Sequence, residues 1–163
     1  MAHVYLGIGS NLGDREEHIR EALKRLNEAG ARVIKQSQLY ETEPWGITDQ
    51  PRFINAACLV ETDLPPHALL RALKRIEREM GRVKGARYGP RIIDLDILLY
   101  DRVEMVTKAL AIPHPGMLER ETVLVPLAEI APTVRHPVTG RTMAENLAML
   151  GEITGIAVYP PGL

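Results

Sequence analysis

Two aspartates, Asp94 and Asp96, lie two positions apart in an apolar run, residues 92–100, that has the composition of an inner strand. Because side chains alternate along a strand, both carboxylates face one side, roughly 6.5–7 Å apart along the strand, while the aliphatic residues face the other. Paired anions on a partly buried surface repel each other and are costly to desolvate. They therefore need cations, which arginines such as Arg91 or a bound metal ion could supply.

The segment before this strand, residues 82–91, is basic and contains two glycines. Its charge comes from Arg82, Lys84, Arg87 and Arg91. Mg²⁺ keeps several waters and takes one or two carboxylates plus the phosphates of a substrate. Phosphoryl transfer depends on positioning and on charge stabilisation by metals and by Arg or Lys side chains. The pattern favours a polyphosphate with its metal; the alternative is a structural salt-bridge pair beside a solvated basic turn.

The glycine-containing turn GIGSNLG, residues 7–13, lies between a predicted strand and a predicted helix. Its spacing is one residue too long for a dinucleotide-binding motif, and no crossover helix precedes the third strand. The chain also lacks the G-x-x-x-x-G-K-[ST] motif, so an ATP site would not be a P-loop. We expect this turn to pack tightly beneath a site.

Segment 41–55, ETEPWGITDQPRFIN, contains the only tryptophan, Trp45, and the only phenylalanine, Phe53. Two scarce aromatics near one loop could line a pocket for a flat heterocycle. Asn55 offers the paired donor and acceptor that the edge of a pterin or purine needs. The alternative is that Phe53 belongs to the core and Asn55 to a turn or a strand edge.

The elements that must position these residues follow from periodicity and capping signals. We predict strands over residues 3–9, 32–40, 53–62 and 92–101, a helix from Asp14 to Gly30, and a helix from Pro65 to Gly81. This βαββαβ order is typical of ferredoxin-like folds and predicts an α+β protein with an antiparallel sheet and helices packed on one face. By analogy with that fold, the first and third strands are central and the fourth lies beside the first.

Residues 103–163 extend this core without a linker, so we expect one domain over residues 1–163. Within this extension, the sequence pattern predicts a short strand near residues 104–106 and a short helix near residues 124–132. The extension also contains a capping box, Thr142 with Glu145, and a possible last strand in GIAVY, residues 155–159.

Composition narrows the class of protein. With 45% hydrophobic and 25% charged residues and a formal net charge of -1, the chain has no global attraction to nucleic acid or anionic membranes. Its one cysteine, Cys58, predicts a buried core residue. The N-terminus has neither a basic leader nor an apolar run long enough for a signal peptide or a membrane span. We expect a cytoplasmic monomer that binds neither nucleic acid nor membranes.

Several motifs together resemble one family. They are IGSNLGD, YETEPWG with DQPRFINA, RYGPRIIDLDILLYD, and PHPGMLER with VLVPLAEIAP, and they run in order from about residue 4 to residue 133. This set is similar to that of the 6-hydroxymethyl-7,8-dihydropterin pyrophosphokinases of folate biosynthesis. GPRIIDLDIL is its most specific part and the glycine turn its least specific.

The resemblance implies a ferredoxin-like α+β fold that transfers the pyrophosphoryl group of ATP to the hydroxymethyl oxygen of the pterin and releases AMP. It implies that Asp94 and Asp96 hold two Mg²⁺ ions on the triphosphate, and that Arg82 and Arg91 stabilise the developing charge. The implied ATP contacts are Lys74, Glu77, Lys84, Arg87, Tyr88, Ile97, His114 and Arg120. The implied pterin contacts are Thr42, Pro44, Trp45, Phe53 and Asn55, with Phe53 stacking on the ring and Asn55 reading its edge.

The chain departs from the family pattern at several positions. Thr122 stands where many members carry an aromatic that covers the second face of the pterin. Tyr88 takes the place of a tryptophan, and Lys74 that of a glutamine. Segment 82–91 is one residue shorter than in some members, so the roles of Lys84 and Arg87 could be exchanged. From the residues alone, His114 is equally compatible with a rigid turn between two prolines.

Two other classes remain as alternatives. A ferredoxin-like ligand-binding or regulatory module would not require an acidic pair beside a basic loop. An RNA-binding sheet would need several exposed aromatics on its inner strands, whereas the third strand offers only Phe53. The length leaves no room for a second folate-pathway activity, so we expect a single pyrophosphokinase domain.

Overall fold

A computed structural model of the chain describes residues 1–43, 49–81 and 90–160. The elements in chain order are β1 (Ala2–Ser10), α1 (Arg15–Glu28), β2 (Ala31–Gln36), β3 (Leu39–Thr42), β4 (Phe53–Thr62), α2 (Pro66–Glu79), β5 (Asp94–Tyr100), β6 (Met105–Val106), β7 (Ala111–Ile112), the 3-10 helix η1 (Met117–Glu119), α3 (Glu121–Ile130), α4 (Met143–Met149) and β8 (Ile156–Tyr159).

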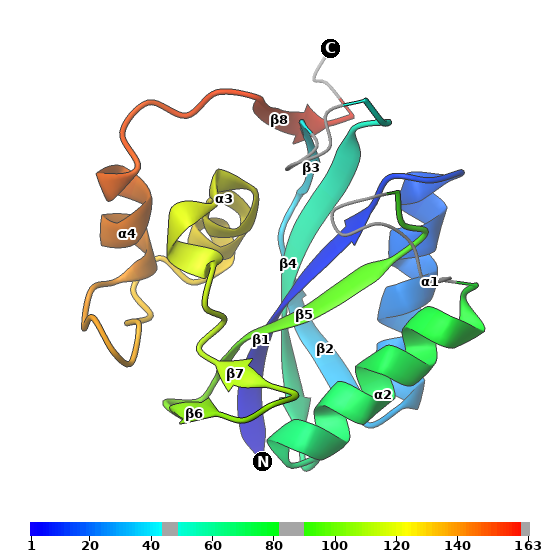
Figure 1. Ribbon diagram of the computed structural model, residues 1–163, viewed down its shortest axis with the longest axis horizontal. Coiled ribbons are helices and arrows are strands. Elements are labelled where there is room, and N and C mark those ends of the chain that lie inside the picture. The colour runs from blue at the N-terminus through cyan, green and yellow to red at the C-terminus, as the bar shows by residue number, and fades with distance from the viewer. Residues whose placement is uncertain (44–48, 82–89, 161–163) are drawn as a thin grey trace.

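The described residues form a six-stranded antiparallel sheet in the order β5-β1-β4-β3-β8, with β2 also paired to β4 (Figure 1). β1 and β4 are therefore central, and β5 lies beside β1, as the βαββαβ pattern predicted. Antiparallel pairing brings the last residues of β1 and β3 to the same end of the sheet as the first residues of β4 and β5. That end carries the candidate site.

The prediction of one continuous strand over residues 32–40 was wrong, because the strand breaks at Ser37 and Gln38. The Ser37 hydroxyl accepts a hydrogen bond from the Ala57 amide at 2.9 Å and donates to the Gln38 carbonyl at 2.7 Å. The Gln38 amide donates to the Glu129 carboxylate of α3, 3.0 Å away. The Ser37 backbone amide still donates to the Ala57 carbonyl at 2.9 Å, but side chains satisfy the Ala57 and Gln38 amides, and this divides the predicted strand into β2 and β3.

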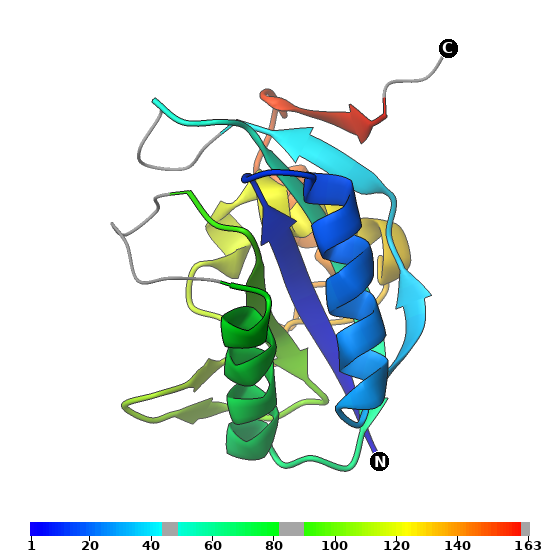
Figure 2. The same cartoon turned by 90° about the vertical axis from the view of Figure 1, so that its right-hand side faces the viewer.

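Helices α1 and α2 pack side by side on one face of the sheet (Figures 1 and 2). The Asp14 carboxylate accepts a hydrogen bond from the Glu17 amide at the start of α1, as the capping signal predicted. Helix α2 begins with proline, which has no amide hydrogen to leave unsatisfied in the first turn. The core between these helices and the sheet consists of residues such as Leu6, Ile8, Ile19, Leu26, Leu69 and Leu73, all nearly inaccessible.

The opposite face of the sheet is also covered, so the prediction of helices on one face only was incomplete. Helices α3 and α4 pack there in a second apolar cluster that includes Leu98 of β5, Leu124, Leu127 and Met143 (Figure 1). The Tyr40 hydroxyl of β3 donates to the Glu129 carboxylate at 2.5 Å and fixes the end of α3 against the sheet. Burial, the hydrogen bond to Glu129 and then the Glu129 charge raise the pKa of Tyr40 to about 12.

The C-terminal extension then returns to the sheet edge. α4 begins with the predicted capping box, in which Thr142 and Glu145 exchange hydrogen bonds. β8 pairs with β3 from Thr42↔Ile156 to Leu39↔Tyr159, so the predicted last strand is confirmed and lies at the outer edge of the sheet. Cys58 is fully buried, and burial raises the pKa of its thiol to about 12.

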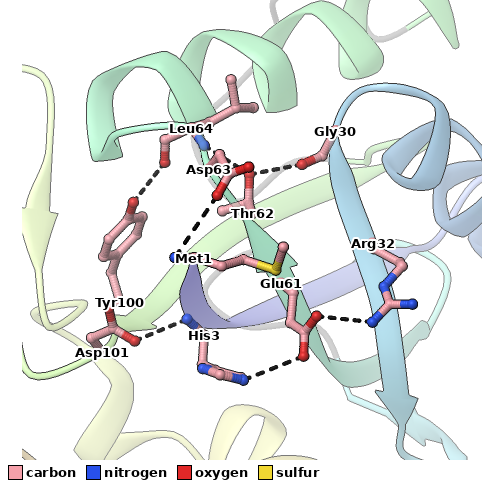
Figure 3. Close-up of polar contacts among 10 residues, drawn as sticks. All are labelled: Met1, His3, Gly30, Arg32, Glu61, Thr62, Asp63, Leu64, Tyr100 and Asp101. Carbon is pink, nitrogen blue, oxygen red and sulfur yellow. Dashed lines mark hydrogen bonds and ion pairs between the residues drawn. The ribbon is translucent and has the colours of Figure 1, made fainter.

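The end of the sheet away from the candidate site is joined by polar contacts between neighbouring strands (Figure 3). Glu61 of β4 accepts from Arg32 of β2 at 2.9 Å and lies 3.4 Å from His3 of β1. The Asp101 carboxylate, just after β5, accepts from the His3 amide at 2.9 Å. The Tyr100 hydroxyl donates to the Leu64 carbonyl at 2.6 Å.

Candidate active site

The two aspartates of β5 lie opposite the two glycines of β1. Asp96 is opposite Gly7, and Asp94 is opposite Gly9, whose other neighbour in the sheet is Asn55 of β4. A Cβ atom at Gly9 would lie 2.8 Å from the Asn55 side-chain nitrogen. Gly9 therefore packs tightly against the Asn55 side chain, which fits the expectation of tight packing in this stretch.

A cavity of about 640 Å³ opens over this end of the sheet, a size that suits a small-molecule ligand. It brings together residues that lie far apart in the sequence, from Thr42 to Val123. The predicted site residues that line it are Thr42, Phe53, Asn55, Lys74, Arg91, Asp94, Asp96, His114 and Arg120. Its acidic pair therefore faces a space bordered by several basic side chains.

The side chains of β5 alternate as the sequence predicted. Asp94 and Asp96 are half-buried, whereas Leu95 and Ile97 are buried in the helix-facing core. The Ile97 side chain is therefore directed into the core, and the ATP contact implied for this residue would have to come from its backbone. That contact remains a prediction.

Glu77 of α2 is almost fully buried, with 3% of its surface exposed. One carboxylate oxygen accepts a hydrogen bond from the Leu95 amide at 2.8 Å, and the other lies 3.3 Å from the Lys74 ammonium. Charge-assisted bonds of this kind are stronger than bonds between neutral groups. Glu77 thus ties α2 to β5 at the residue between the two aspartates. The ATP contact implied for Glu77 remains a prediction.

Thr42 and Asn55 form a buried pair on neighbouring strands. The Thr42 hydroxyl donates to the Asn55 side-chain oxygen at 2.5 Å, and Thr42 is 1% exposed. The Asn55 oxygen is therefore the end of the amide that faces Thr42, and the NH₂ group points away from Thr42. Phe53, opposite Thr42 in the sheet, borders the same cavity.

His114 lies after β7, and hydrogen bonds to its backbone and to its ring hold it in place. Its amide donates to the Leu98 carbonyl at 3.0 Å, and the Gly116 amide donates to the ring Nδ1 at 3.2 Å. Burial, and then the Arg120 charge, lower the pKa of His114, while Asp94 opposes that shift. The lowered pKa favours the neutral ring, and the hydrogen bond from Gly116 makes Nδ1 an acceptor, which places the ring hydrogen on Nε2.

Six predicted site residues lie outside the described residues: Pro44, Trp45, Arg82, Lys84, Arg87 and Tyr88. The cavity also contains residues that the sequence reasoning did not assign, namely Glu43, Pro115, Gly116 and Val123. Pro115 and Gly116 belong to the run IPHPG, which was assigned only for its histidine. Thr122 lines the cavity as well, so a small polar side chain occupies the position where an aromatic was expected.

The acidic pair forms only part of a ligand set for a metal ion. Across residues 1–43, 49–81 and 90–160, no group of three or more His, Cys, Asp or Glu side chains could hold one. Two carboxylates facing a cavity fit Mg²⁺, which completes its shell with water and substrate phosphates. None of the helices in the described part of the chain has the length and apolar content needed to cross a membrane.

Comparison with known proteins identifies a family. The sequence model of the family described as 7,8-dihydro-6-hydroxymethylpterin-pyrophosphokinase (HPPK) matches residues 5–132. A protein of Methylorubrum extorquens named 2-amino-4-hydroxy-6-hydroxymethyldihydropteridine pyrophosphokinase is 45% identical over 151 residues, which are 92% of this chain and 94% of the relative.

Other relatives are much longer. The folic acid synthesis protein fol1 of Pneumocystis carinii is 48% identical over 141 residues, which are 86% of this chain. The chain spans only about a fifth of the length of that relative, since the match covers 19% of it. Among solved structures, a Plasmodium falciparum HPPK-DHPS A437G chain matches 91% of this chain with a TM-score of 0.73 and 18% identity, and this likeness shows the fold.

Proposed function

The chain belongs to the 7,8-dihydro-6-hydroxymethylpterin-pyrophosphokinase family, and on that premise we propose that it transfers pyrophosphate from ATP to 6-hydroxymethyl-7,8-dihydropterin in folate biosynthesis. The observation that carries the proposal is one cavity that joins Asp94 and Asp96 with basic side chains and with Asn55. In this reaction the hydroxymethyl oxygen forms a bond to the β-phosphorus of ATP. The bond from that phosphorus to the oxygen of AMP breaks, and the hydroxyl proton passes to solvent.

The pterin is proposed to occupy the side of the cavity formed by β3 and β4. Phe53 stacks on the ring, and the NH₂ group of Asn55 donates to an acceptor at its edge, because Thr42 already occupies the Asn55 oxygen. Pro44 and Trp45 complete the pterin contacts in this proposal. Thr122 takes the position of a second stacking residue, so we expect Phe53 to supply most of the stacking energy.

ATP is proposed to occupy the side formed by β5, α2 and the His114 segment. His114 donates from Nε2 to a phosphate oxygen, because its Nδ1 is held by Gly116. Lys74 and Arg120 border the same space and offer charge to the triphosphate. Lys84, Arg87, Tyr88, Glu77 and Ile97 are the further proposed ATP contacts.

Arg91 and Arg82 are proposed to stabilise the charge that develops on the transferred group. Preorganised cations in a site shielded from water act most strongly where charge develops in the transition state. Asp94 and Asp96 would hold Mg²⁺, two ions in our proposal, and the metal would supply charge neutralisation on the triphosphate oxygens. The two carboxylates lie opposite Gly7 and Gly9 of β1.

We further propose that the protein acts in the cytoplasm as a monomer, with ATP and the pterin as small-molecule substrates and without nucleic acid or membrane partners. Sedimentation equilibrium of the purified protein at assay concentration tests this, and a stable dimer would contradict it.

Nucleotide analysis of a reaction with ATP, Mg²⁺ and 6-hydroxymethyl-7,8-dihydropterin tests the proposed activity. We expect AMP to form only when pterin and metal are both present. ADP in place of AMP would mean transfer of the γ-phosphoryl group and would refute the proposed chemistry. Well-folded protein that converts no nucleotide would favour a binding module.

A further inference from the structure

Asn11, in the glycine turn that the proposed chemistry leaves without a role, is one of the most buried polar residues of the protein. It is 1% exposed, and it is not among the described residues that line the cavity. A buried asparagine amide must satisfy two donor hydrogens and one acceptor oxygen. The partners of these three groups show what the side chain does.

The acceptor end of Asn11 holds Arg91. The Arg91 backbone amide donates to the Asn11 side-chain oxygen at 2.7 Å, and the Asn11 backbone amide donates to the Arg91 carbonyl at 3.0 Å. This reciprocal pair fixes the backbone of Arg91 to the end of β1. The proposed charge-stabilising side chain therefore starts from an anchored backbone.

The donor end of the same amide holds the segment that leads into β4. The Asn11 NH₂ group donates to the Gln50 side-chain oxygen at 2.9 Å and to the Pro51 carbonyl at 3.0 Å. Gln50 and Pro51 lie only a few residues before Phe53, the proposed stacking residue. One planar amide thus links the pterin side of the cavity to Arg91 on the phosphate side.

Resting on the proposed function, we propose that Asn11 is a positioning residue that sets the distance between the two substrates. Its oxygen orients Arg91, and its nitrogen orients the segment before Phe53, so the two sides of the cavity share one rigid group. Reactive groups that are misplaced by about 1 Å can lose about a hundredfold in rate. A residue that touches neither substrate can therefore control the reaction through this spacing.

The two ends of the amide can be tested separately. Asn11→Asp keeps an oxygen for the Arg91 amide but places a carboxylate oxygen against the Pro51 carbonyl, which cannot donate. The Gln50 amide can rotate to donate, so the Pro51 contact is the one that is lost. We expect the KM for pterin to rise about tenfold, with kcat changed by less than about threefold, as for roughly one buried hydrogen bond left unmade.

Leucine has a shape similar to that of asparagine, but Asn11→Leu removes the side-chain hydrogen bonds at both ends of the amide. We expect the same rise in the KM for pterin, and in addition a fall in kcat of about tenfold or more, because the Arg91 amide loses its acceptor. The KM for ATP should change by less than about threefold in both variants, since Arg91 is proposed to act in the transition state.

Asn146→Asp is the matched control. Asn146 of α4 is also buried, at 4% exposure, and its NH₂ group donates to the Arg141 carbonyl at 3.3 Å, away from the residues that line the cavity. The same chemical change there should lower the melting temperature and leave the KM values and kcat of the folded enzyme within about twofold of the parent.

The outcomes distinguish this proposal from the proposed function. A parent protein that forms no AMP refutes the function. An active parent whose Asn11 variants lose thermal stability, but keep both KM values and kcat per folded molecule, overturns the positioning role. If Asn11→Asp does not fold, Gln50→Met, at a half-exposed position, removes one acceptor of the same amide. An unchanged KM for pterin in that variant would overturn the proposal equally.

Discussion

Both ends of the sheet carry acidic residues beside basic ones, but the two ends arrange them differently. At the end drawn in Figure 3, Glu61 accepts directly from Arg32, and Asp101 accepts from the backbone of His3. At the other end, Asp94 and Asp96 border a cavity of about 640 Å³ that Lys74, Arg91 and Arg120 also line. The same residue types thus cross-link strands at one end, whereas at the other an acidic pair and three basic side chains border one larger cavity.

This difference shows why acidic residues at strand ends do not by themselves identify a site. A cavity of about 440 Å³ also lies beside Arg32 and Glu61, but these two charges are paired with each other across neighbouring strands, so a ligand there would have to compete with that pair. Charges set around a cavity can share a polyphosphate and its metal, which is the arrangement that phosphoryl transfer requires. Gly9 of β1, opposite Asp94, leaves room for the Asn55 side chain that borders this cavity.

The largest expected effect on activity comes from changing an aspartate to asparagine at the cavity end of the sheet, and the same change at the other end is its control. Asp96→Asn should reduce AMP formation by at least about a hundredfold and leave the fold intact, because Asp96 is half-buried and lies opposite a glycine. Asp101→Asn, at a position with a φ of 46° that asparagine tolerates, should keep full activity. Steady-state kinetics with circular dichroism would check both, and full activity of Asp96→Asn at ordinary Mg²⁺ would refute the metal assignment.

Arg91→Ala should have the next largest effect. The backbone bonds between Arg91 and Asn11 survive this change, so only the guanidinium is lost. We expect kcat to fall by about thirtyfold or more, with the KM for ATP changed by less than about threefold, because the charge that Arg91 meets develops in the transition state. Arg32→Ala is the control at the other end of the sheet. An unchanged kcat with weakened ATP binding would reverse the role assigned to Arg91.

Gly9→Ala and Gly7→Ala form a pair of identical changes two positions apart on one strand. A Cβ at Gly9 would lie 2.8 Å from the Asn55 side-chain nitrogen, whereas a Cβ at Gly7 would make ordinary contacts of 3.6 Å with Leu98. We expect Gly9→Ala to raise the KM for pterin about tenfold and Gly7→Ala to change it less than about threefold. Equal effects of the two substitutions on pterin binding would contradict the assigned role of Asn55.

The smallest effect on catalysis is expected for Glu61→Gln, which should change the stability of the protein and leave its activity unchanged. The hydrogen bond from Arg32, and then charge from Arg32 and His3, lower the pKa of Glu61 in the folded protein. A lowered carboxyl pKa contributes stability above the unfolded value, and that contribution is lost as the pH falls through the folded value. Thermal unfolding of the parent and Glu61→Gln should therefore differ at pH 7 and converge at acidic pH, with AMP formation alike in both. A difference that grows on acidification would contradict this assignment.

The sequence predicted those parts of the fold that depend on local pattern. The alternation around Asp94 and Asp96, the cap at Asp14 and the capping box at Thr142 follow from neighbouring residues and are confirmed. The break between β2 and β3 depends on Ser37 meeting Ala57 and on Gln38 meeting Glu129, contacts that no local pattern encodes. The cover that α3 and α4 provide for the second face of the sheet is likewise a long-range result.

Less of the candidate site followed from spacing alone. His114 and Arg120 were assigned through the family resemblance, and only the folded chain brings them into the cavity of Asp94. Asn11 was missed because asparagine in a glycine-containing turn is expected to stabilise the turn itself. Its contacts to Gln50, Pro51 and Arg91 join positions 39 to 80 residues away in the sequence.

The most direct test of the difference between the two ends uses Mn²⁺ in place of Mg²⁺, with a non-hydrolysable ATP analogue, and records amide resonances of the protein. Paramagnetic broadening acts only near the metal, so it locates the bound ion. We predict that the Gly7, Gly9 and Leu95 amides broaden most when metal and nucleotide are both present, and that His3 and Glu61 broaden much less. Broadening at His3 and Glu61 with none at Gly7, Gly9 and Leu95 would contradict the assignment of Asp94 and Asp96 as the metal-binding end of the sheet.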